Sequence, residues 1–283
     1  MTFAKGGHAI CVFLQTKDPE ALAQAHVALG YRAAYCPDFL SLDDLAQVRA
    51  VEKAFAQADV CIAELGARCN PLDKDPAKAK ANRQYIAQRL ALADEVGARC
   101  CVNILGSFCE TGRWDGPSFD AYDETFFQAC VEVYRQILDA VRPKRSFMTF
   151  ETMPYYFLDG PEEYLRLLRA IDRPGAAVHL DVCNCVNSPR VYVQNAELIS
   201  RCFRLLSGKI RSCHLKDIKL ADDEGCTAVF REVQPGSGKL DLARLLSCAK
   251  REEDLPVMLE HLPAEQNYLD ARDHVLGLLG DLA

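Results

Sequence analysis

The segment KIRSCHLK, residues 209–216, is a short run of apolar residues and cysteine that ends in ionisable side chains. Its composition and length are typical of a buried β-strand. Seven further runs of this kind occur along the chain, and a longer segment of helical periodicity follows each of them. In chain order they are 9–15, 31–36, 59–65, 99–105, 146–151, 177–182 and 256–261. Eight alternating strands and helices predict a single (β/α)8 TIM barrel.

The segment DPEALAQAHVALG, residues 18–30, illustrates the helical signals. Asp18 and Pro19 form an N-cap and first-turn pair, and Gly30 is placed to end the helix. No Pro-rich or Gly-rich linker divides the sequence, so residues 1–283 are predicted to form one TIM-barrel domain. A doubly wound open sheet is the alternative, but no G-x-G-x-x-G motif follows the first predicted strand to support it.

The composition narrows the classes of partner and compartment. The net charge of −7 argues against a broad nucleic-acid surface, which requires clustered Lys and Arg. The first residues lack the apolar region of a signal peptide, and no apolar run approaches 18 residues, so we expect a cytoplasmic protein without a membrane contact. Many of the fourteen cysteines lie in apolar runs, which is typical of reduced, structural thiols.

Four successive predicted strands end in residues that can bind a metal: Glu151, Asp181, His214 and Glu260. Each alone is more typical of a solvated or hydrogen-bonded strand end than of a ligand. Catalytic groups of TIM barrels lie at the C-terminal ends of the strands, and side-chain alternation allows all four to face the barrel axis. Three converging carboxylates repel one another unless a cation binds among them. We therefore predict a divalent metal site, with Mn²⁺ as the first choice and Mg²⁺, Co²⁺ or Zn²⁺ as alternatives.

The motifs FETMP, HLDVCN, SCHLKD and MLEHL, together with the loop PGSGKLD (235–241), resemble the xylose-isomerase-like sugar phosphate isomerase/epimerase superfamily. That superfamily includes ketose 3-epimerases, hydroxypyruvate isomerase, inosose dehydratase and, more distantly, endonuclease IV. The resemblance implies that Glu151, Asp181, His214 and Glu260 match, in strand order, the metal-binding tetrad of the ketose 3-epimerases.

The resemblance also implies a reaction. A sugar or polyol derivative loses a proton from the carbon beside its carbonyl through a metal-stabilised enediolate, and Glu151 and Glu260 act as the acid–base pair. The expected enzyme is therefore a metal-dependent isomerase or epimerase. A lyase or dehydratase, similar to inosose dehydratase or cleaving a keto-glycoside, begins with the same proton abstraction and is the alternative.

Five further residues are candidates for substrate binding. Asn184 follows Asp181 by three residues and occupies the place where related epimerases carry a histidine, although a turn residue is an equal alternative. His179 lies one layer below Asp181, where a barrel-core histidine is an equal alternative. Asn103 is polar within an apolar run, as is Glu64 on the preceding strand. Lys216 shares the inward side of His214, where it either neutralises a charge of the substrate or is a solvated strand end. Trp114 lies in a long loop after the fourth strand, where it either stacks on a sugar ring or packs the loop.

Two positions depart from the ketose epimerases. Where those enzymes carry a substrate-gripping glutamate and arginine, this chain has Phe157 and Leu220, so a standard free-ketohexose epimerase is not expected. We expect a small-molecule partner and no nucleic acid, and the sequence leaves a homo-oligomer open. An endonuclease of the same fold and a non-catalytic metal-binding barrel are the alternatives from other functional classes.

Overall fold

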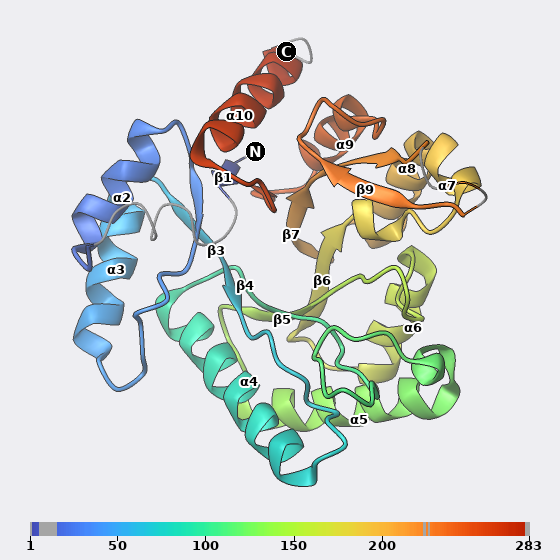
Figure 1. The fold of residues 1–283 in the computed structure, drawn as a ribbon. Coiled ribbons are helices and arrows are strands. Elements are labelled where there is room, and N and C mark those ends of the chain that lie inside the picture. The colour runs from blue at the N-terminus through green and yellow to red at the C-terminus, as the bar shows by residue number, and fades with distance from the viewer. Residues whose placement is uncertain (1, 6–15, 223–224, 226, 281–283) are drawn as a thin grey trace.

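The computed structural model describes residues 2–5, 16–222, 225 and 227–280. Within these residues, parallel strands form a closed barrel, and helices surround it on the outside (Figure 1). The strand β10 closes the ring by pairing with β1, with Thr2 opposite Pro256. The predicted (β/α)8 barrel is therefore confirmed. In their order around the ring, the strands are β1 (Thr2–Lys5), β2 (Ala33–Tyr35), β3 (Cys61–Gly66), β4 (Cys100–Asn103), β5 (Phe147–Glu151), β6 (Ala176–Asp181), β7 (Ile210–Leu215) and β10 (Pro256–Leu259).

The helices begin and end where the sequence provides caps. Asp18 accepts hydrogen bonds from the first backbone amides of α2, Pro19 is its first residue, and Gly30 follows it with a φ of +78°, as predicted. The helical segments are α2 (Pro19–Ala28), α3 (Leu45–Gln57), α4 (Pro76–Val96), η1 (Phe119–Tyr122), α5 (Glu124–Val141), α6 (Pro161–Ile171), η2 (Cys183–Cys185), α7 (Pro189–Val193), α8 (Asn195–Leu206), α9 (Leu242–Ala249) and α10 (Glu265–Gly280).

The main hydrophobic core lies between the outer face of the barrel and the helices. On β5, Met148 and Phe150 are fully buried in this layer, and the ring of Phe150 meets Tyr134 of α5 edge-on at 4.7 Å between ring centroids. The alternate residues Thr149 and Glu151 consequently point toward the barrel axis. This alternation holds the candidate site residues inside the barrel while their neighbours anchor each strand to a helix.

The ends of the predicted strands differ from the observed ones. The predicted first strand, 9–15, lies outside the described residues, and Thr2–Lys5 forms β1. The predicted strand 209–216 ends at Leu215 as β7, and after one residue the chain enters a hairpin that the sequence did not indicate. This hairpin pairs β8 (Asp217–Leu220) with β9 (Phe230–Val233) in antiparallel fashion. The β7 strand therefore runs almost directly into a separate two-stranded sheet.

The side chain of Asp217 secures the loop that follows the hairpin. Its two carboxylate oxygens accept hydrogen bonds from the backbone amides of Ile218 (2.8 Å), Gly236 (3.0 Å), Gly238 (2.9 Å) and Leu240 (3.0 Å). A Cβ atom at Gly238 would lie 2.2 Å from the Asp217 carboxylate, so only glycine fits there. The PGSGKLD segment is thus folded around one buried carboxylate.

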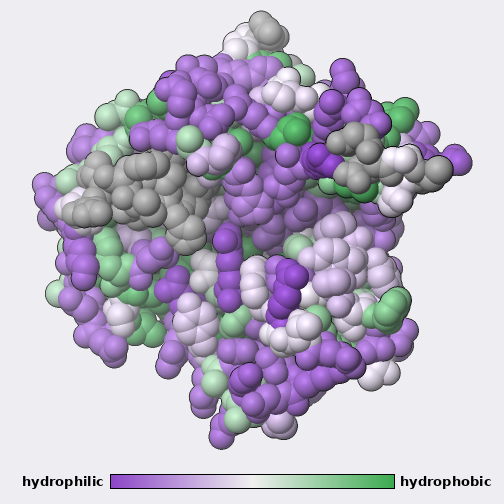
Figure 2. Space-filling model, in the orientation of Figure 1, coloured by the Kyte–Doolittle hydropathy of each residue, from purple (hydrophilic) through white to green (hydrophobic). Residues whose placement is uncertain are grey.

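The loops that follow the strands gather at the C-terminal end of the barrel. Figure 2 shows hydrophilic residues around a hollow at the centre of the molecule as viewed in Figure 1. The interior of the barrel at this end contains buried polar residues, among them Glu64, Asp181, His214 and Glu260. Such a concentration of buried charge is typical of a functional site.

Candidate metal centre

The structure brings the four predicted metal ligands together. Glu151 and Asp181 are the last residues of β5 and β6, His214 lies on β7, and Glu260 follows β10. The Nδ1 atom of His214 is 3.0 Å from Oε2 of Glu260, 3.2 Å from Oε1 of Glu151 and 3.8 Å from Oδ2 of Asp181. One donor atom from each residue lies within 4.8 Å of the other three. The cluster follows from strand register, since Asp181 and Met258 both lie opposite His214.

The donor atoms of this cluster fit a divalent cation. Oδ2 of Asp181 and Oε2 of Glu260 are buried and make no hydrogen bond. The second oxygen of each carboxylate is already held, because Oδ1 of Asp181 accepts the amides of Cys183 and Asn184, and Oε1 of Glu260 accepts from Arg68 at 3.1 Å. Each carboxylate therefore keeps one oxygen for the cluster. Three oxygens and one imidazole nitrogen suit Mn²⁺, Mg²⁺ or Co²⁺.

Lys216 lies among the same carboxylates. Its Nζ is 2.9 Å from Oδ2 of Asp181 and 2.9 Å from Oε2 of Glu260, and the side chain is buried. Lys216 therefore forms an ion pair with both of these carboxylates. Lys216 was predicted to lie on the same inward side of β7 as His214, and these contacts agree with that prediction. Lys216 thus contributes a permanent positive charge next to the proposed ligands.

The electrostatics of the cluster are strongly coupled. Burial alone would raise the pKa of Asp181 and of Glu260, but the charge of Lys216 holds the pKa of Asp181 low, and His214 lowers that of Glu260. Burial would lower the pKa of His214, and the surrounding carboxylates raise it instead, with Glu260 contributing most. Without a metal, protonated His214 and Lys216 balance the carboxylates. A divalent cation can take over the role of the proton on His214.

Asn184 lies beside the cluster and contacts one of its members. Its amide nitrogen donates to the carbonyl of Thr152 at 3.0 Å and approaches Oε1 of Glu151 at 3.5 Å. The side chain is half-buried, in the turn that follows β6. In this position it orients Glu151, and its predicted contact with substrate stays a prediction.

Asn103 holds the backbone that follows β3, and its predicted contact with substrate stays a prediction. Its amide nitrogen donates to the carbonyl of Cys69 (3.1 Å) and the hydroxyl of Tyr134 (3.2 Å), and its oxygen accepts the amide of Cys69 (3.4 Å). The backbone amide and carbonyl of Cys69, which follow β3, find their hydrogen-bond partners in this side chain, and this explains a polar residue within an apolar run. The same contacts fix the neighbouring residue, Arg68, whose guanidinium reaches Glu260.

His179 lies below the metal cluster and is fully buried. Its ring packs edge-on against that of His214, with 4.1 Å between the centroids, and its Nδ1 is 3.4 Å from Oε1 of Glu64. Burial and the neighbouring His214 lower its pKa, so the ring is neutral. This depth agrees with the prediction of a layer beneath Asp181 and favours a structural histidine over a substrate contact.

Trp114 is half-buried and packs the loop after β4. Together with Met153 and Tyr155 it covers a small apolar cluster formed by Ile104, Ala121 and Tyr156. The tyrosine hydroxyls hold the loop, because that of Tyr155 donates to the carbonyl of Asp115 (2.7 Å). The structure thus places Trp114 in the loop-packing arrangement that the sequence left open.

The segment MPYYF, residues 153–157, follows β5 and contains one of the two positions that depart from the ketose epimerases. Phe157, which stands at a position where the ketose epimerases carry a glutamate, is buried against Phe126 and Phe127. It therefore belongs to the core between barrel and helices. Leu220, at the other departing position, is partly buried on β8 and packs against the same core.

Sequence reasoning missed several residues at the site. Arg68 contacts Glu260, and Glu232 on β9 lies 3.4 Å from Nζ of Lys216 and 2.8 Å from Nδ1 of His261. Tyr35 of β2 lies 3.0 Å from Nε2 of His214. Tyr35 could have been found from the sequence, because it ends the predicted second strand. Glu232 could not, because its position depends on the hairpin of β8 and β9, which was not predicted.

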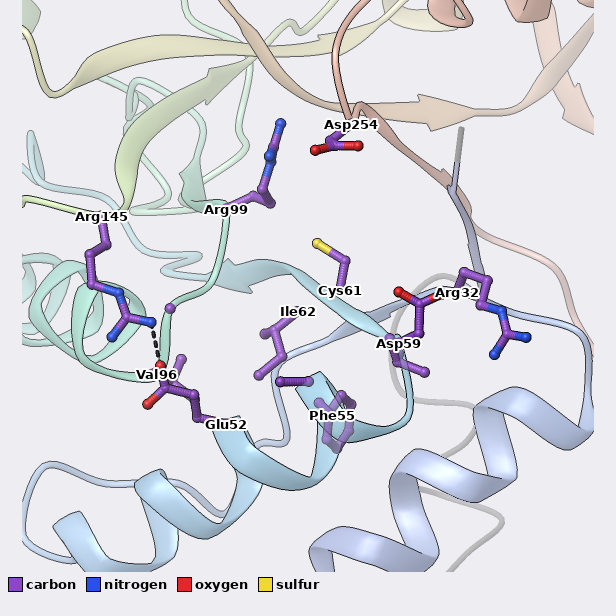
Figure 3. A pocket seen from close by; sticks show the side chains of 13 residues that line it. Arg32, Glu52, Phe55, Asp59, Cys61, Ile62, Val96, Arg99, Arg145 and Asp254 are labelled. Carbon is purple, nitrogen blue, oxygen red and sulfur yellow. Dashed lines mark hydrogen bonds and ion pairs between the residues drawn. The ribbon is translucent and has the colours of Figure 1, made fainter.

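A separate cavity of about 390 Å³ opens at the opposite end of the barrel (Figure 3). It is lined by residues that precede the strands, including Arg32, Arg99 and Arg145, with Glu52 and Asp254. Arg145 forms an ion pair with Glu52 across its wall. Basic and acidic side chains both line this cavity, and none of the residues of the metal cluster takes part in it.

The comparisons with known proteins agree with the architecture. A family model described as "Xylose isomerase-like TIM barrel" matches residues 23–277. The chain belongs to this xylose isomerase-like TIM barrel family. No curated protein sequence matches the chain significantly.

Solved structures share the fold over nearly their whole length. The probable 3-DHS dehydratase AsbF from Bacillus anthracis is 15% identical, with a TM-score of 0.72 over 98% of this chain and 99% of that one. Endonuclease IV from Thermus thermophilus is 16% identical, with a TM-score of 0.70 over 99% and 100%. The 3-keto-D-glucoside 4-epimerase YcjR from E. coli is 13% identical, with a TM-score of 0.65 over 98% and 99%. At these identities the likeness shows the fold alone, and the fold serves an epimerase, a dehydratase and a nuclease.

Two further properties concern the environment of the protein. None of the helices in the described ranges combines the length and apolar character that crossing a bilayer requires. The twelve cysteines that the structure describes are all free thiols.

Proposed function

We propose that the protein is a divalent-metal-dependent isomerase or epimerase of a small sugar or polyol derivative. The observation that carries this proposal is the convergence of Glu151, Asp181, His214 and Glu260 within 4.8 Å at the C-terminal end of the barrel. A bound cation, with Mn²⁺ as our first choice, supplies Lewis acidity toward a substrate carbonyl oxygen. Asp181 and His214 hold it without taking part in proton transfer.

Glu151 and Glu260 are the proposed acid–base pair. They approach Nδ1 of His214 from different strands, so they can act on different sides of a substrate bound between them. Glu260 is buried and fixed by Arg68, while Glu151 is partly exposed. Among the described residues, none hydrogen-bonds Oε2 of Glu151, which leaves that oxygen open to accept a proton from the carbon beside a carbonyl.

A lyase or dehydratase is the second candidate, and Lys216 favours it. Elimination is favoured by a positive charge that stabilises the departing oxygen, and the ammonium of Lys216 is buried next to Asp181 and Glu260. The net charge of −7 supports a small-molecule partner over nucleic acid. The free thiols support a reducing compartment, and we propose the cytoplasm.

The test follows proton abstraction directly, because it precedes isomerisation, epimerisation and elimination alike. The Mn²⁺-loaded protein is incubated in D₂O with a panel of ketoses, keto-glycosides and inososes, and NMR detects deuterium entering beside the carbonyl. We expect exchange for one class of substrate, and a loss of at least a hundredfold in Glu151→Gln and in Glu260→Gln. The control is Thr149→Val, a buried, nearly isosteric change on β5. If metal binding and exchange survive both glutamate substitutions, the assignment fails.

A further inference from the structure

A second set of polar residues lies behind His214, on the side opposite the metal cluster. Nδ1 of His214 faces Glu151, Asp181 and Glu260, whereas Nε2 faces the hydroxyl of Tyr35 at 3.0 Å and Oε2 of Glu64 at 3.5 Å. The imidazole is therefore held between two groups of oxygen atoms. Which nitrogen carries the proton decides whether the other can bind a cation.

Glu64 lies on β3 inside the barrel and is 1% exposed. The hydroxyl of Ser212 donates to its Oε1, and Nδ1 of His179 is 3.4 Å from the same oxygen. The Ser212 hydroxyl and the imidazole nitrogen both approach Oε1, so the carboxyl group of Glu64 acts here as a hydrogen-bond acceptor.

We propose that Glu64, together with Tyr35, is a positioning residue that keeps the proton of His214 on Nε2 and so presents the lone pair of Nδ1 to the metal. This inference rests on the metal site of the proposed function. A neutral imidazole has one N–H and one acceptor nitrogen, and a carboxylate behind Nε2 favours the tautomer with the proton on that side. The negative charge also makes Nδ1 a more basic ligand.

The arrangement of Ser212 and His179 supports this role. Ser212 occupies Oε1 of Glu64, which leaves Oε2 as the oxygen nearer to His214. His179 packs against the ring of His214 and limits its rotation. Glu64, His179 and His214 also form a group whose donor atoms lie within 4.8 Å, so a second cation is the competing interpretation.

The test measures metal affinity rather than turnover. Mn²⁺ binding is titrated by EPR on the full chain, and the metal-to-protein ratio is determined in the same experiment. We expect one Mn²⁺ per chain, and a dissociation constant 10- to 100-fold higher in Glu64→Gln, which is the usual effect of removing such an outer partner. Glu64→Asp, which restores the charge, should recover part of the affinity. Thr149→Val, a matched change inside the barrel, should leave it unchanged.

The tautomer gives a second readout that a merely structural role would not change. In the Mg²⁺-loaded protein with ¹⁵N-labelled histidine, NMR should detect the His214 proton on Nε2.

If Glu64→Gln does not fold, a second variant tests the polar contacts of His214 Nε2. Tyr35→Phe removes the half-buried hydroxyl that lies 3.0 Å from this nitrogen, and it should also weaken Mn²⁺ binding. Unchanged affinity in the folded variants overturns the inference while the metal site stands, and a proton on Nδ1 overturns it together with the assignment of His214 as a ligand. Two Mn²⁺ per chain, one of them lost in Glu64→Gln, overturns it in favour of a second cation. A wild-type chain that binds no divalent metal overturns both the inference and the proposed metal site.

Discussion

The ammonium of Lys216 lies 2.9 Å from Oδ2 of Asp181, the oxygen that also faces His214 in the predicted metal centre. The protein thus places its own cation at the edge of the site. In the absence of a metal, this contact lowers the repulsion between Asp181 and Glu260. Replacing Lys216 should therefore change the stability of the metal-free protein.

Lys216→Met should lower the free energy of unfolding of the metal-free protein by about 3 kcal/mol, since buried carboxylates lose their partner. Saturating Mn²⁺ should restore more stability in this variant than in the wild type, because the cation replaces the missing charge. Urea unfolding in EDTA and in Mn²⁺ measures both effects. Lys219→Met, an exposed lysine on β8, is the control and should change stability by less than about 0.5 kcal/mol. A metal-free Lys216→Met protein as stable as the wild type would contradict the prediction.

Asp217 should be a strong determinant of stability, although it is not a metal ligand. Asp217→Ala leaves four buried or partly buried amides without their acceptor. We expect the free energy of unfolding to fall by about 3 kcal/mol. Chemical denaturation measures this, with Asp222→Ala as an exposed control on the same hairpin. Equal losses in the two variants would show that the carboxylate does not organise the PGSGKLD loop.

Trp114 is the only tryptophan of the chain, so its fluorescence reports on its surroundings alone. If the indole also meets the substrate, a sugar that undergoes exchange should shift or quench the emission. Trp114→Phe should then raise KM roughly three- to tenfold, which corresponds to the 0.5–1.5 kcal/mol of an aromatic contact. Phe119→Leu, an exposed aromatic position further along the same loop, is the control. An unchanged emission and KM would leave Trp114 with loop packing only.

Cys61 and Cys109 should differ widely in their reactivity toward alkylating reagents, because their thiol pKa values are shifted in opposite directions. Burial raises the pKa of Cys61 to about 11, so its thiol stays protonated at neutral pH. The hydroxyl of Thr111 lowers the pKa of Cys109, so its thiolate forms at a lower pH. Relative to an ordinary pKa of 9, the thiolate of Cys61 is depleted roughly hundredfold. Brief treatment with iodoacetamide at pH 7.5, followed by peptide mass mapping, should modify Cys109 well before Cys61. Modification in the reverse order would contradict these pKa directions.

The strands and the four converging side chains could be predicted from sequence because both depend on local periodicity. Glu151, Asp181 and His214 alternate with buried neighbours, and a barrel directs one parity of residues to its axis. The partners of His214 could not be predicted in this way. Tyr35 and Glu64 reach it across the barrel from β2 and β3, and that contact depends on the register of several strands.

Two structural features could not be predicted from the sequence, for different physical reasons. Asn103 is polar within a buried strand, and nothing in the local pattern indicated that the backbone at Cys69 would use its amide. The hairpin of β8 and β9 was missed because DIKL is short and follows β7 after a single residue. Its recognition depends on pairing with FREV, ten residues further along the chain, and not on either strand alone.

The continuity of β7 with this hairpin has a consequence for engineering. One extended stretch of chain carries His214, Lys216 and Asp217. A shift of the backbone at the base of the hairpin is therefore passed on directly to the metal-binding end of β7. Insertions or randomised residues at the hairpin base would shift the histidine itself. The whole length of β8 separates the connection between Leu220 and Phe230 from that histidine, so changes confined to this connection should leave the metal ligands in place.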